Sequence, residues 1–185
     1  MSFYLDARNV EDYIDMAKGF NGEDLISVLK QYLVKDSSVL EIGMGPGVDY
    51  ELLSEYFNVL GTDFSPIFIE RYKSMHPDAN VCILNAITMD IDQKFDGIYS
   101  NKVLMHFEKN EMIASLVKQK KMLNNGGIMV HSLWKGTTTE AYDGLRFVYY
   151  TEEILRDCLE GHFEILEIQS YKEMEEDDSI FIVLR

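Results

Sequence analysis

Three glycines stand close together in the segment VLEIGMGPGVDYELL (39–53), at positions Gly43, Gly45 and Gly47. Glycines between a strand and a helix allow a tight turn and let a ligand lie against bare backbone, facing the N–H groups of the helix. Asp63 ends the next apolar run, twenty positions after Gly43. That spacing suits a carboxylate that accepts hydrogen bonds from ribose hydroxyls. The combination of strand, glycine turn, helix, strand and acid predicts a site for a ligand that contains a ribose.

The elements that must position these residues follow from the spacing of apolar side chains. Helical patterns alternate with short apolar runs typical of buried strands. We expect helices over 9–18, 22–34, 48–57, 66–75 and 108–123 and from Thr151 onward, and strands over 39–42, 58–63, 80–84, 95–101, 127–134, 163–173 and 179–185. Such alternation implies parallel βαβ units. No helix separates the last two strands, so they are expected to form an antiparallel hairpin at one edge of the sheet.

Three connections carry further expectations. The run Asn124-Asn125-Gly126-Gly127 is expected to end the preceding helix, because Asn and Gly accept the left-handed backbone of a helix C-terminus. KGTTTEAYDG (135–144) is expected to be a polar loop. EMEEDD (173–178) is expected to be a solvated hairpin tip, with a cation site as the less favoured interpretation.

The glycine spacing separates two classes of ligand. A dinucleotide site has the pattern G-x-G-x-x-G, which would place its third glycine at position 48, where this chain has Val48. The pattern here is G-x-G-x-G, preceded by Glu41 inside the strand. With an acid at the end of the second strand, it resembles the class I S-adenosylmethionine-dependent methyltransferases, and the order of elements matches from about residue 20 to the end. The resemblance implies an α/β, Rossmann-like, seven-stranded, mostly parallel sheet with an antiparallel C-terminal hairpin and helices on both faces.

The resemblance also implies roles for individual residues. The loop under the amino acid part of the cofactor matches Glu41, Gly43, Met44, Gly45 and Gly47. The segment beside the methionine moiety and the reacting methyl matches Asn101, Lys102 and Val103. Asp63 matches the ribose-binding acid, and Phe64 stands where the family often packs a side chain on the adenine. Asn85 and Ala86 follow the third strand, where the family usually has an Asp and a small residue near the adenine amino group. For Glu41, a role only at the end of the sheet is the alternative.

The acceptor side of the site is less sharply defined. His106, in the run LMHF, is either a general base that faces the acceptor or a residue that caps the next helix. His131 lies on a strand and is expected to be a core histidine. The loop at 134–150 follows the fifth strand on the ligand side of the sheet. Its candidates for acceptor contacts are Trp134, Arg146 and Tyr149, with ordinary packing as the alternative. Tyr4 and Tyr13 are expected to close over the site as a lid.

Composition bounds the remaining possibilities. With 185 residues the chain is expected to form one methyltransferase domain, with N-terminal helices or a lid over 1–34 and a core over 35–185. Seventeen Lys and Arg against 32 Asp and Glu leave a net charge of −15, which would repel nucleic acid and anionic membranes. The N-terminus has neither a basic start nor an apolar run, so no signal peptide is expected. Cys82 and Cys158 are expected to be reduced core thiols, which indicates a cytoplasmic protein.

The expected activity is methyl transfer from S-adenosyl-L-methionine, with S-adenosyl-L-homocysteine as product. The family's signature for base amino groups, [DNS]-P-P-[YF], is absent, and SNKV (100–103) stands in its place. A small-molecule acceptor is therefore expected, attacked in line, with no nucleic acid or membrane partner. No two histidines or cysteines have metal-ligand spacing, so no metal is expected. The alternatives are a methyltransferase that acts on a protein, a non-catalytic protein that binds the same cofactor and, least favoured, a nicotinamide-dependent dehydrogenase.

Overall fold

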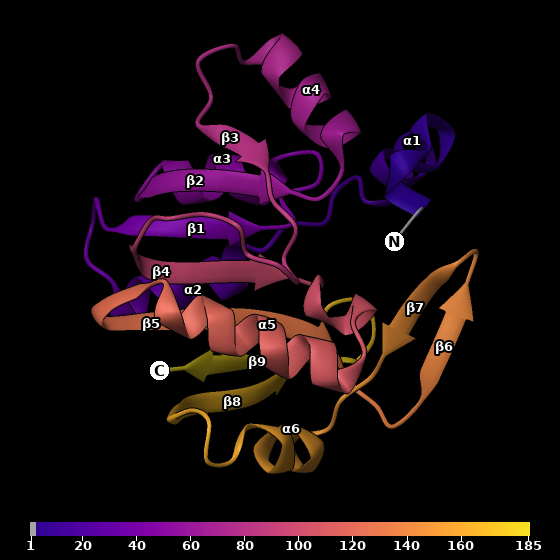
Figure 1. Ribbon diagram of the computed structural model, residues 1–185. Helices are drawn as coiled ribbons and strands as arrows, with labels where there is room; N and C mark the ends of the chain where they lie inside the picture. The colour runs from indigo at the N-terminus through magenta and orange to yellow at the C-terminus, as the bar shows by residue number, and fades with distance from the viewer. Residues whose placement is uncertain (1–2) are drawn as a thin grey trace.

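The computed structural model describes residues 3–185, and its centre is a seven-stranded sheet (Figure 1). The strand order is β3-β2-β1-β4-β5-β9-β8. The bounds are β1 (Ser38–Ile42), β2 (Asn58–Asp63), β3 (Val81–Ile83), β4 (Phe95–Asn101), β5 (Leu123–Trp134), β8 (Ile165–Tyr171) and β9 (Ser179–Leu184). The pairs among β1 to β5 are parallel, whereas β9 runs antiparallel to both β5 and β8. This arrangement confirms the predicted fold class, including the antiparallel hairpin at one edge.

Helices cover both faces of this sheet, and Figure 1 shows α5 in front of it and α2 behind it. The helices are α1 (Ala7–Met16), α2 (Glu23–Tyr32), α3 (Val48–Ser54), α4 (Pro66–Met75), α5 (Lys109–Lys121) and α6 (Glu152–Leu159), with 3-10 turns η1 (Phe3–Leu5) and η2 (Leu104–His106). Successive strand residues point to opposite faces. On β1, Val39 joins the core beneath α2 and α3, whereas Leu40 joins the core beneath α5 and α6. Within residues 3–185, no helix combines the length and the apolar character needed to cross a membrane.

The expected helix stop at Asn124–Gly127 is wrong. Helix α5 ends at Lys121 with Met122 as its C-cap, and β5 begins at Leu123. The carbonyl of Met122 accepts a hydrogen bond from the Phe95 backbone N–H, and the Asn124 amide donates to the Asp96 carboxylate. These contacts draw the Asn-Gly run onto β4 as part of a strand, with a register shift before the regular pairing of Gly97 with Ile128.

The expected polar loop over 135–144 is also wrong, because most of it forms a hairpin. Strands β6 (Thr139–Tyr142) and β7 (Leu145–Val148) pair antiparallel, and their connection is Asp143-Gly144. Both turn residues have positive φ, 49° and 81°, as a two-residue hairpin turn of Asp-Gly type requires. The Asp-Gly pair is thus a local sequence signal for this hairpin. In Figure 1 the hairpin projects from the side toward which the parallel strands point.

Candidate functional site

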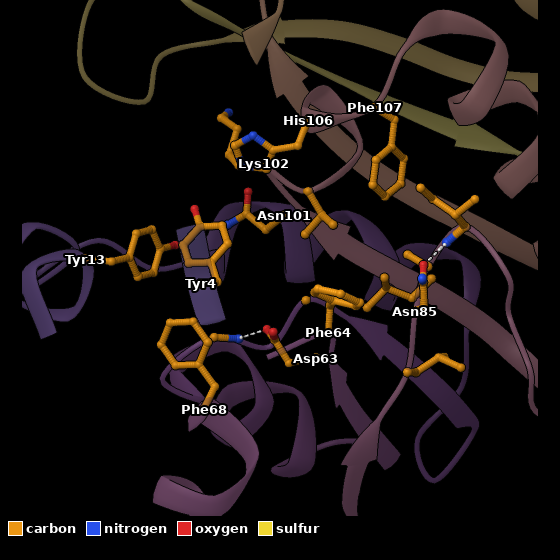
Figure 2. Close-up of a pocket in the computed structure, with 17 residues that line it drawn as sticks. Tyr4, Tyr13, Asp63, Phe64, Phe68, Asn85, Asn101, Lys102, His106 and Phe107 are labelled. Carbon is orange, nitrogen blue, oxygen red and sulfur yellow. Dashed lines mark hydrogen bonds between the residues drawn. The ribbon is translucent and has the colours of Figure 1, made fainter. Parts of the chain in front are cut away.

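A cleft of about 800 Å³, open to solvent, lies at the carboxyl ends of the parallel strands. Its place at the strand ends is where α/β sheets bind ligands. The strands, the glycine loop, η1, α1, α4 and η2 all contribute to it. The lining residues are Tyr4, Tyr13, Ile42, Gly43, Gly45, Asp63, Phe64, Phe68, Leu84, Asn85, Ala86, Ile87, Asn101, Lys102, Val103, His106 and Phe107 (Figure 2).

The glycine loop is held by close approaches that a side chain would prevent. Gly43 has a φ of 73°, and a Cβ there would stand 2.4 Å from Val103 Cγ2. Gly47 is the N-cap of α3 with a φ of 96°, and a Cβ there would stand 2.3 Å from the Tyr72 ring. Gly43 and Gly45 line the cleft, whereas Gly47 does not. The loop therefore presents bare backbone to the cleft.

Asp63 connects the loop to the next strand. Its carboxylate accepts a hydrogen bond from the Gly45 N–H at 2.9 Å and another from the Ser65 N–H at 2.8 Å. Burial raises the pKa of Asp63, and the backbone N–H groups act in the opposite direction. An ionised carboxylate has about four acceptor positions, so two remain for a ligand in the cleft.

Glu41 is buried at the end of β1, two residues before the loop, and is only 2% exposed. Among the described residues, no donor lies within hydrogen-bond distance of its Oε2 atom. Burial, together with the nearby carboxylates of Asp49 and Asp63, raises the pKa of Glu41 well above its usual range. No ion pair within residues 3–185 involves any of these three carboxylates. The site therefore gathers three carboxyl groups without an ion-pair partner among the described residues, and a cationic ligand would favour their ionised forms.

Asp49 organises the side of the loop that faces α2. It accepts hydrogen bonds from the Gly22 N–H, the Tyr99 hydroxyl at 2.7 Å and the Asn101 amide at 3.1 Å. Asn101 is thereby fixed at the end of β4, where it lines the cleft. Sequence reasoning missed Asp49, although its place in the first turn of the helix after the glycines is a recognisable signal.

A second end of the cleft is apolar. Phe64, Ala86 and Ile87 line it, and the Asn85 Oδ1 atom accepts a hydrogen bond from the Ile87 N–H at 2.8 Å. That bond orients the Asn85 amide and leaves its Nδ2 donor for a ligand. An aromatic face with one polar group beside it suits a heteroaromatic ring such as adenine.

His106 lies at the end of η2 and lines the cleft. Its Nδ1 atom is 2.7 Å from the Arg146 carbonyl oxygen, which can only accept, so Nδ1 carries the proton and Nε2 keeps a lone pair. Burial lowers the pKa of His106, which keeps the imidazole neutral near pH 7. The expectation that His106 caps a helix is wrong, because Glu108 and Glu111 form the capping box of α5.

His131 takes no part in the cleft, as expected. It is fully buried, and its Nδ1 atom lies 2.7 Å from the Ser100 hydroxyl. Burial lowers the pKa of His131 to about 3, so it stays neutral as a core residue.

An aromatic cluster that includes two residues of the N-terminal segment lines one side of the cleft. The Tyr4 ring lies 5.4 Å from the Tyr13 ring and 6.0 Å from the Phe68 ring, and 6.1 Å from the imidazole of His106. The Ser65 hydroxyl donates to the Tyr4 carbonyl and ties the segment to the residue that follows Asp63 and Phe64. Figure 2 shows Tyr4, Tyr13 and Phe68 on one side of the cleft and Asn85 and Phe107 on the other. Phe68 and Phe107 were missed; Phe68 follows Phe64 at helical spacing, and Phe107 follows His106.

The structure places the three expected acceptor residues outside the cleft walls. The Arg146 guanidinium pairs with Glu108 at 2.9 Å, and the Tyr149 hydroxyl donates to Glu140 at 3.3 Å. The Trp134 ring packs against the ammonium of Lys102, the residue that follows β4. Of the expected cofactor residues, Glu41, Met44 and Gly47 also lie behind the cleft surface rather than on it. The others line it.

Comparison with known proteins agrees with this geometry. Residues 39–127 match the model of a family described as a methyltransferase domain. A solved S-adenosylmethionine-dependent methyltransferase from Clostridium acetobutylicum ATCC 824 superposes with a TM-score of 0.77 at 14% identity, covering 97% of this chain and 99% of that one. The 1,6-didemethyltoxoflavin-N1-methyltransferase of Burkholderia thailandensis, solved with 1,6-didemethyltoxoflavin and S-adenosylhomocysteine, has a TM-score of 0.80 at 18% identity, covering 96% and 84%. The N-methyltransferase NodS of Bradyrhizobium japonicum WM9, in complex with S-adenosylhomocysteine, has a TM-score of 0.68 at 19% identity, covering 92% and 90%.

The fold and the matched domain thus define a class I methyltransferase fold. The resemblance drawn from the glycine loop and the acid after it is confirmed: residues 39–127 match a methyltransferase-domain model, and the solved S-adenosylmethionine-dependent methyltransferases share the fold.

Proposed function

We propose that this protein transfers a methyl group from S-adenosylmethionine to a nitrogen atom of a small-molecule acceptor, with His106 as the general base. The observation that carries the proposal is the cleft itself. It brings the bare glycine loop, the Asp63 carboxylate, the Asn85 amide and a neutral imidazole with a free lone pair onto one surface.

The residues present fit this cofactor. Glu41, Asp49 and Asp63 form a group of carboxylates without a cationic partner among the described residues, and Oε2 of Glu41 has no donor. S-Adenosylmethionine carries positive charge on its sulfur and its amino group, which would stabilise the ionised forms of these carboxyl groups. Asp63 would hold the ribose hydroxyls, Phe64 and Asn85 would hold the adenine, and Asn101 with the glycine loop would hold the amino acid end. When bound, this cofactor supplies a methyl group on a positively charged sulfur, which an acceptor atom displaces in line.

His106 would take the proton that the acceptor nitrogen loses. Its lone pair is on Nε2, and the Arg146 carbonyl keeps Nδ1–H in place before and after the proton moves. A base of lowered pKa is unprotonated at neutral pH and therefore available. Arg146 thus contributes its carbonyl oxygen, which orients the base, while its guanidinium holds β7 to the start of α5 through Glu108.

The N-terminal segment would close the site. Tyr4 and Tyr13 line the cleft beside Phe68. Closure of this segment over a bound ligand would exclude water and align donor and acceptor. We propose on this basis that η1 and α1 form a lid over a methyltransferase core.

Two observations favour a small acceptor with a nitrogen nucleophile. The cleft is walled by aromatic rings (Tyr4, Phe68 and Phe107), which suit flat or weakly basic molecules. The solved neighbours with a stated reaction type include N-methyltransferases, among them the toxoflavin-precursor enzyme and NodS.

The test begins with calorimetric titration of S-adenosylmethionine and S-adenosylhomocysteine, with NADH as the control. Binding of the two adenosyl ligands and not NADH is expected. A screen of heteroaromatic and aliphatic amines against basic peptides, read by transfer of a radiolabelled methyl group, then identifies the acceptor. Transfer to peptides only would replace the small-molecule acceptor with a protein. Tight binding without any transfer would make the protein a non-catalytic cofactor binder, and absence of binding would refute the proposal.

A further inference from the structure

Lys102 has a strained backbone at the edge of the cleft. It follows β4 directly, between Asn101 and Val103, and its φ of 56° lies in the left-handed region that side chains other than glycine rarely adopt. Such a conformation persists only where surrounding contacts hold it. The contacts that hold it here come from the far half of the sheet.

The side chain of Lys102 ends in a cage of protein groups. Its Nζ atom donates to the Tyr171 hydroxyl at 2.8 Å and to the Ser179 hydroxyl at 2.9 Å, and lies 3.3 Å from Oε2 of Glu173. The same ammonium stands 4.3 Å from the centre of the Trp134 ring and 4.8 Å from that of the Tyr171 ring. The side chains of Lys102 and Glu173 are 13% and 14% exposed. The partners of the ammonium therefore come from β5, β8 and β9 and from the acidic tip that joins β8 to β9.

This cage changes the interpretation of the acidic tip at 173–178. The Asp178 carboxylate accepts hydrogen bonds from the backbone N–H groups of Glu173, Met174 and Glu175, so the tip has a defined shape. Residues 174–177 are exposed, as expected of a solvated tip, whereas Glu173 folds back toward Lys102. The shape of the tip thus determines where the anchor for Lys102 lies.

A second chain of contacts leads from Lys102 back to the cleft. The Lys102 N–H donates to the Ser132 hydroxyl at 3.0 Å, and that hydroxyl donates to Oδ1 of Asn101, whose amide nitrogen donates to Asp49. On the other side, Val103 fills the space above Gly43. A change of backbone at residue 102 would therefore move Asn101 and Val103, which both line the cleft next to the glycine loop.

We propose that Lys102 is a positioning residue, whose anchorage in the cage of Trp134, Tyr171, Glu173 and Ser179 holds the strained turn that aims Asn101 and Val103 at the amino acid end of the cofactor. The inference rests on the proposed function, because it concerns affinity for the same adenosyl ligand. It assigns the far edge of the sheet, through Glu173, a part in setting that affinity.

The electrostatics agree with such a role and give it a pH dependence. Burial lowers the pKa of Lys102 to about 8, with Glu173 and Asp178 acting in the opposite direction. The groups that face the ammonium are Glu173, Asp178 and the Tyr171 hydroxyl, whose own pKa is raised by burial. As the pH rises through about 8, the ammonium loses its proton, and both the ion pair and the cation–π contacts weaken.

The test compares Lys102→Met with Glu173→Gln, and uses Lys135→Met as a matched control. Lys135 pairs with Asp177 at the same tip but does not line the cleft. Met keeps the length of the Lys102 stem and removes the ammonium, with its charge and its hydrogen bonds to Tyr171 and Ser179. We expect the Kd for S-adenosylhomocysteine to rise about tenfold in Lys102→Met and about threefold in Glu173→Gln, the size expected when a network residue is removed. The control should stay within about twofold of the parent, as surface changes usually do.

Two further measurements separate positioning from general support. The KM for S-adenosylmethionine should rise in Lys102→Met with little change in kcat. We expect the parent to lose affinity for S-adenosylhomocysteine between pH 7 and pH 9 as Lys102 loses its proton, and we expect this loss to disappear in Lys102→Met. Hydrogen exchange of the peptide over 95–108, without any ligand, should become faster in Lys102→Met and not in Lys135→Met. Parent-like affinity and parent-like exchange in Lys102→Met would overturn the inference. If the parent itself binds no adenosyl ligand, the proposed function fails, and the assignment of cofactor positioning fails with it. The hydrogen-exchange data would still decide whether the cage holds the strained turn at Lys102. Should Lys102→Met not fold, Glu173→Gln carries the same comparison.

Discussion

Replacement of Asp63 by Ala removes two hydrogen bonds to a carboxylate, those from the Gly45 N–H at 2.9 Å and the Ser65 N–H at 2.8 Å. Hydrogen bonds to charged groups contribute about 1.5–3 kcal/mol each, and because burial raises the pKa of Asp63 we take the lower value. The free energy of unfolding should therefore fall by about 3 kcal/mol. For a chain of this size that corresponds to a fall in Tm of roughly 6–12 °C.

Asp63→Asn tests whether the loss in the free energy of unfolding comes from the two hydrogen bonds of the carboxylate. The amide keeps one acceptor oxygen but turns its NH₂ group toward the second N–H, so about half of the loss in stability is expected. Both variants should bind S-adenosylmethionine about ten- to a hundredfold more weakly, because the ribose loses charge-assisted hydrogen bonds. Asp157→Asn, on the exposed face of α6, is the control for loss of one surface charge.

Thermal unfolding followed by circular dichroism measures the first effect, and calorimetric titration of the folded variants measures the second. A Tm of Asp63→Ala within about 2 °C of the parent would refute the assignment of stability to these two bonds, since that change corresponds to about 1 kcal/mol or less. Unchanged affinity in Asp63→Asn would refute the role of the carboxylate at the ribose.

Three further predictions follow from the same cleft. Gly43→Ala should lower the free energy of unfolding by about 1–3 kcal/mol in urea titrations, because its Cβ would stand 2.4 Å from Val103 and its φ is positive. The double variant Gly43→Ala with Val103→Ala should recover only the part of this loss that is due to the steric clash. Full recovery in the double variant would argue against backbone strain at Gly43. His106→Ala should lower kcat by about 10²–10⁴-fold and leave the Kd for S-adenosylhomocysteine unchanged; parent-like turnover would remove His106 from the reaction. Glu41 keeps its proton to higher pH when folded than when unfolded, so its contribution to stability falls as the pH rises above the unfolded value of 4.5. Glu41→Gln should therefore be more stable than the parent at pH 8 but bind S-adenosylmethionine more weakly. A stability difference between Glu41→Gln and the parent that is the same at pH 5 and pH 8 would contradict this.

The predicted elements agree with the structure most closely where local signals were strong. The strands at 58–63 and 95–101 and the helix at 66–75 have the predicted bounds. The helix begins at Pro66, which suits a first helical position, and ends at Met75, just before His76 and Pro77. The errors lie where the same residues allow two outcomes. Asn124–Gly127 can end a helix or continue into a strand edge, and only the pairing with β4 selects the strand. The hairpin at 139–148 could have been predicted from Asp143-Gly144, whose backbone preference is local.

The candidate site divides in the same way. Gly43, Gly45, Asp63, Phe64 and Asn85 occupy the cleft as expected, because their places at strand ends follow from chain order alone. By contrast, Trp134, Arg146 and Tyr149 face other partners, and the choice among those partners depends on how the hairpin packs.

Residue order alone determined that this chain forms a parallel sheet with a glycine turn and an acid at neighbouring strand ends, because backbone preferences and apolar periodicity act over a few residues. Only the tertiary structure decided the state of His106, whose proton is held on Nδ1 by a carbonyl forty residues away. It also decided the surroundings of Lys102, where side chains from three strands and the acidic tip surround one ammonium. Protonation state and orientation depend on burial and on partners distant in the sequence, and those exist only once the chain has folded.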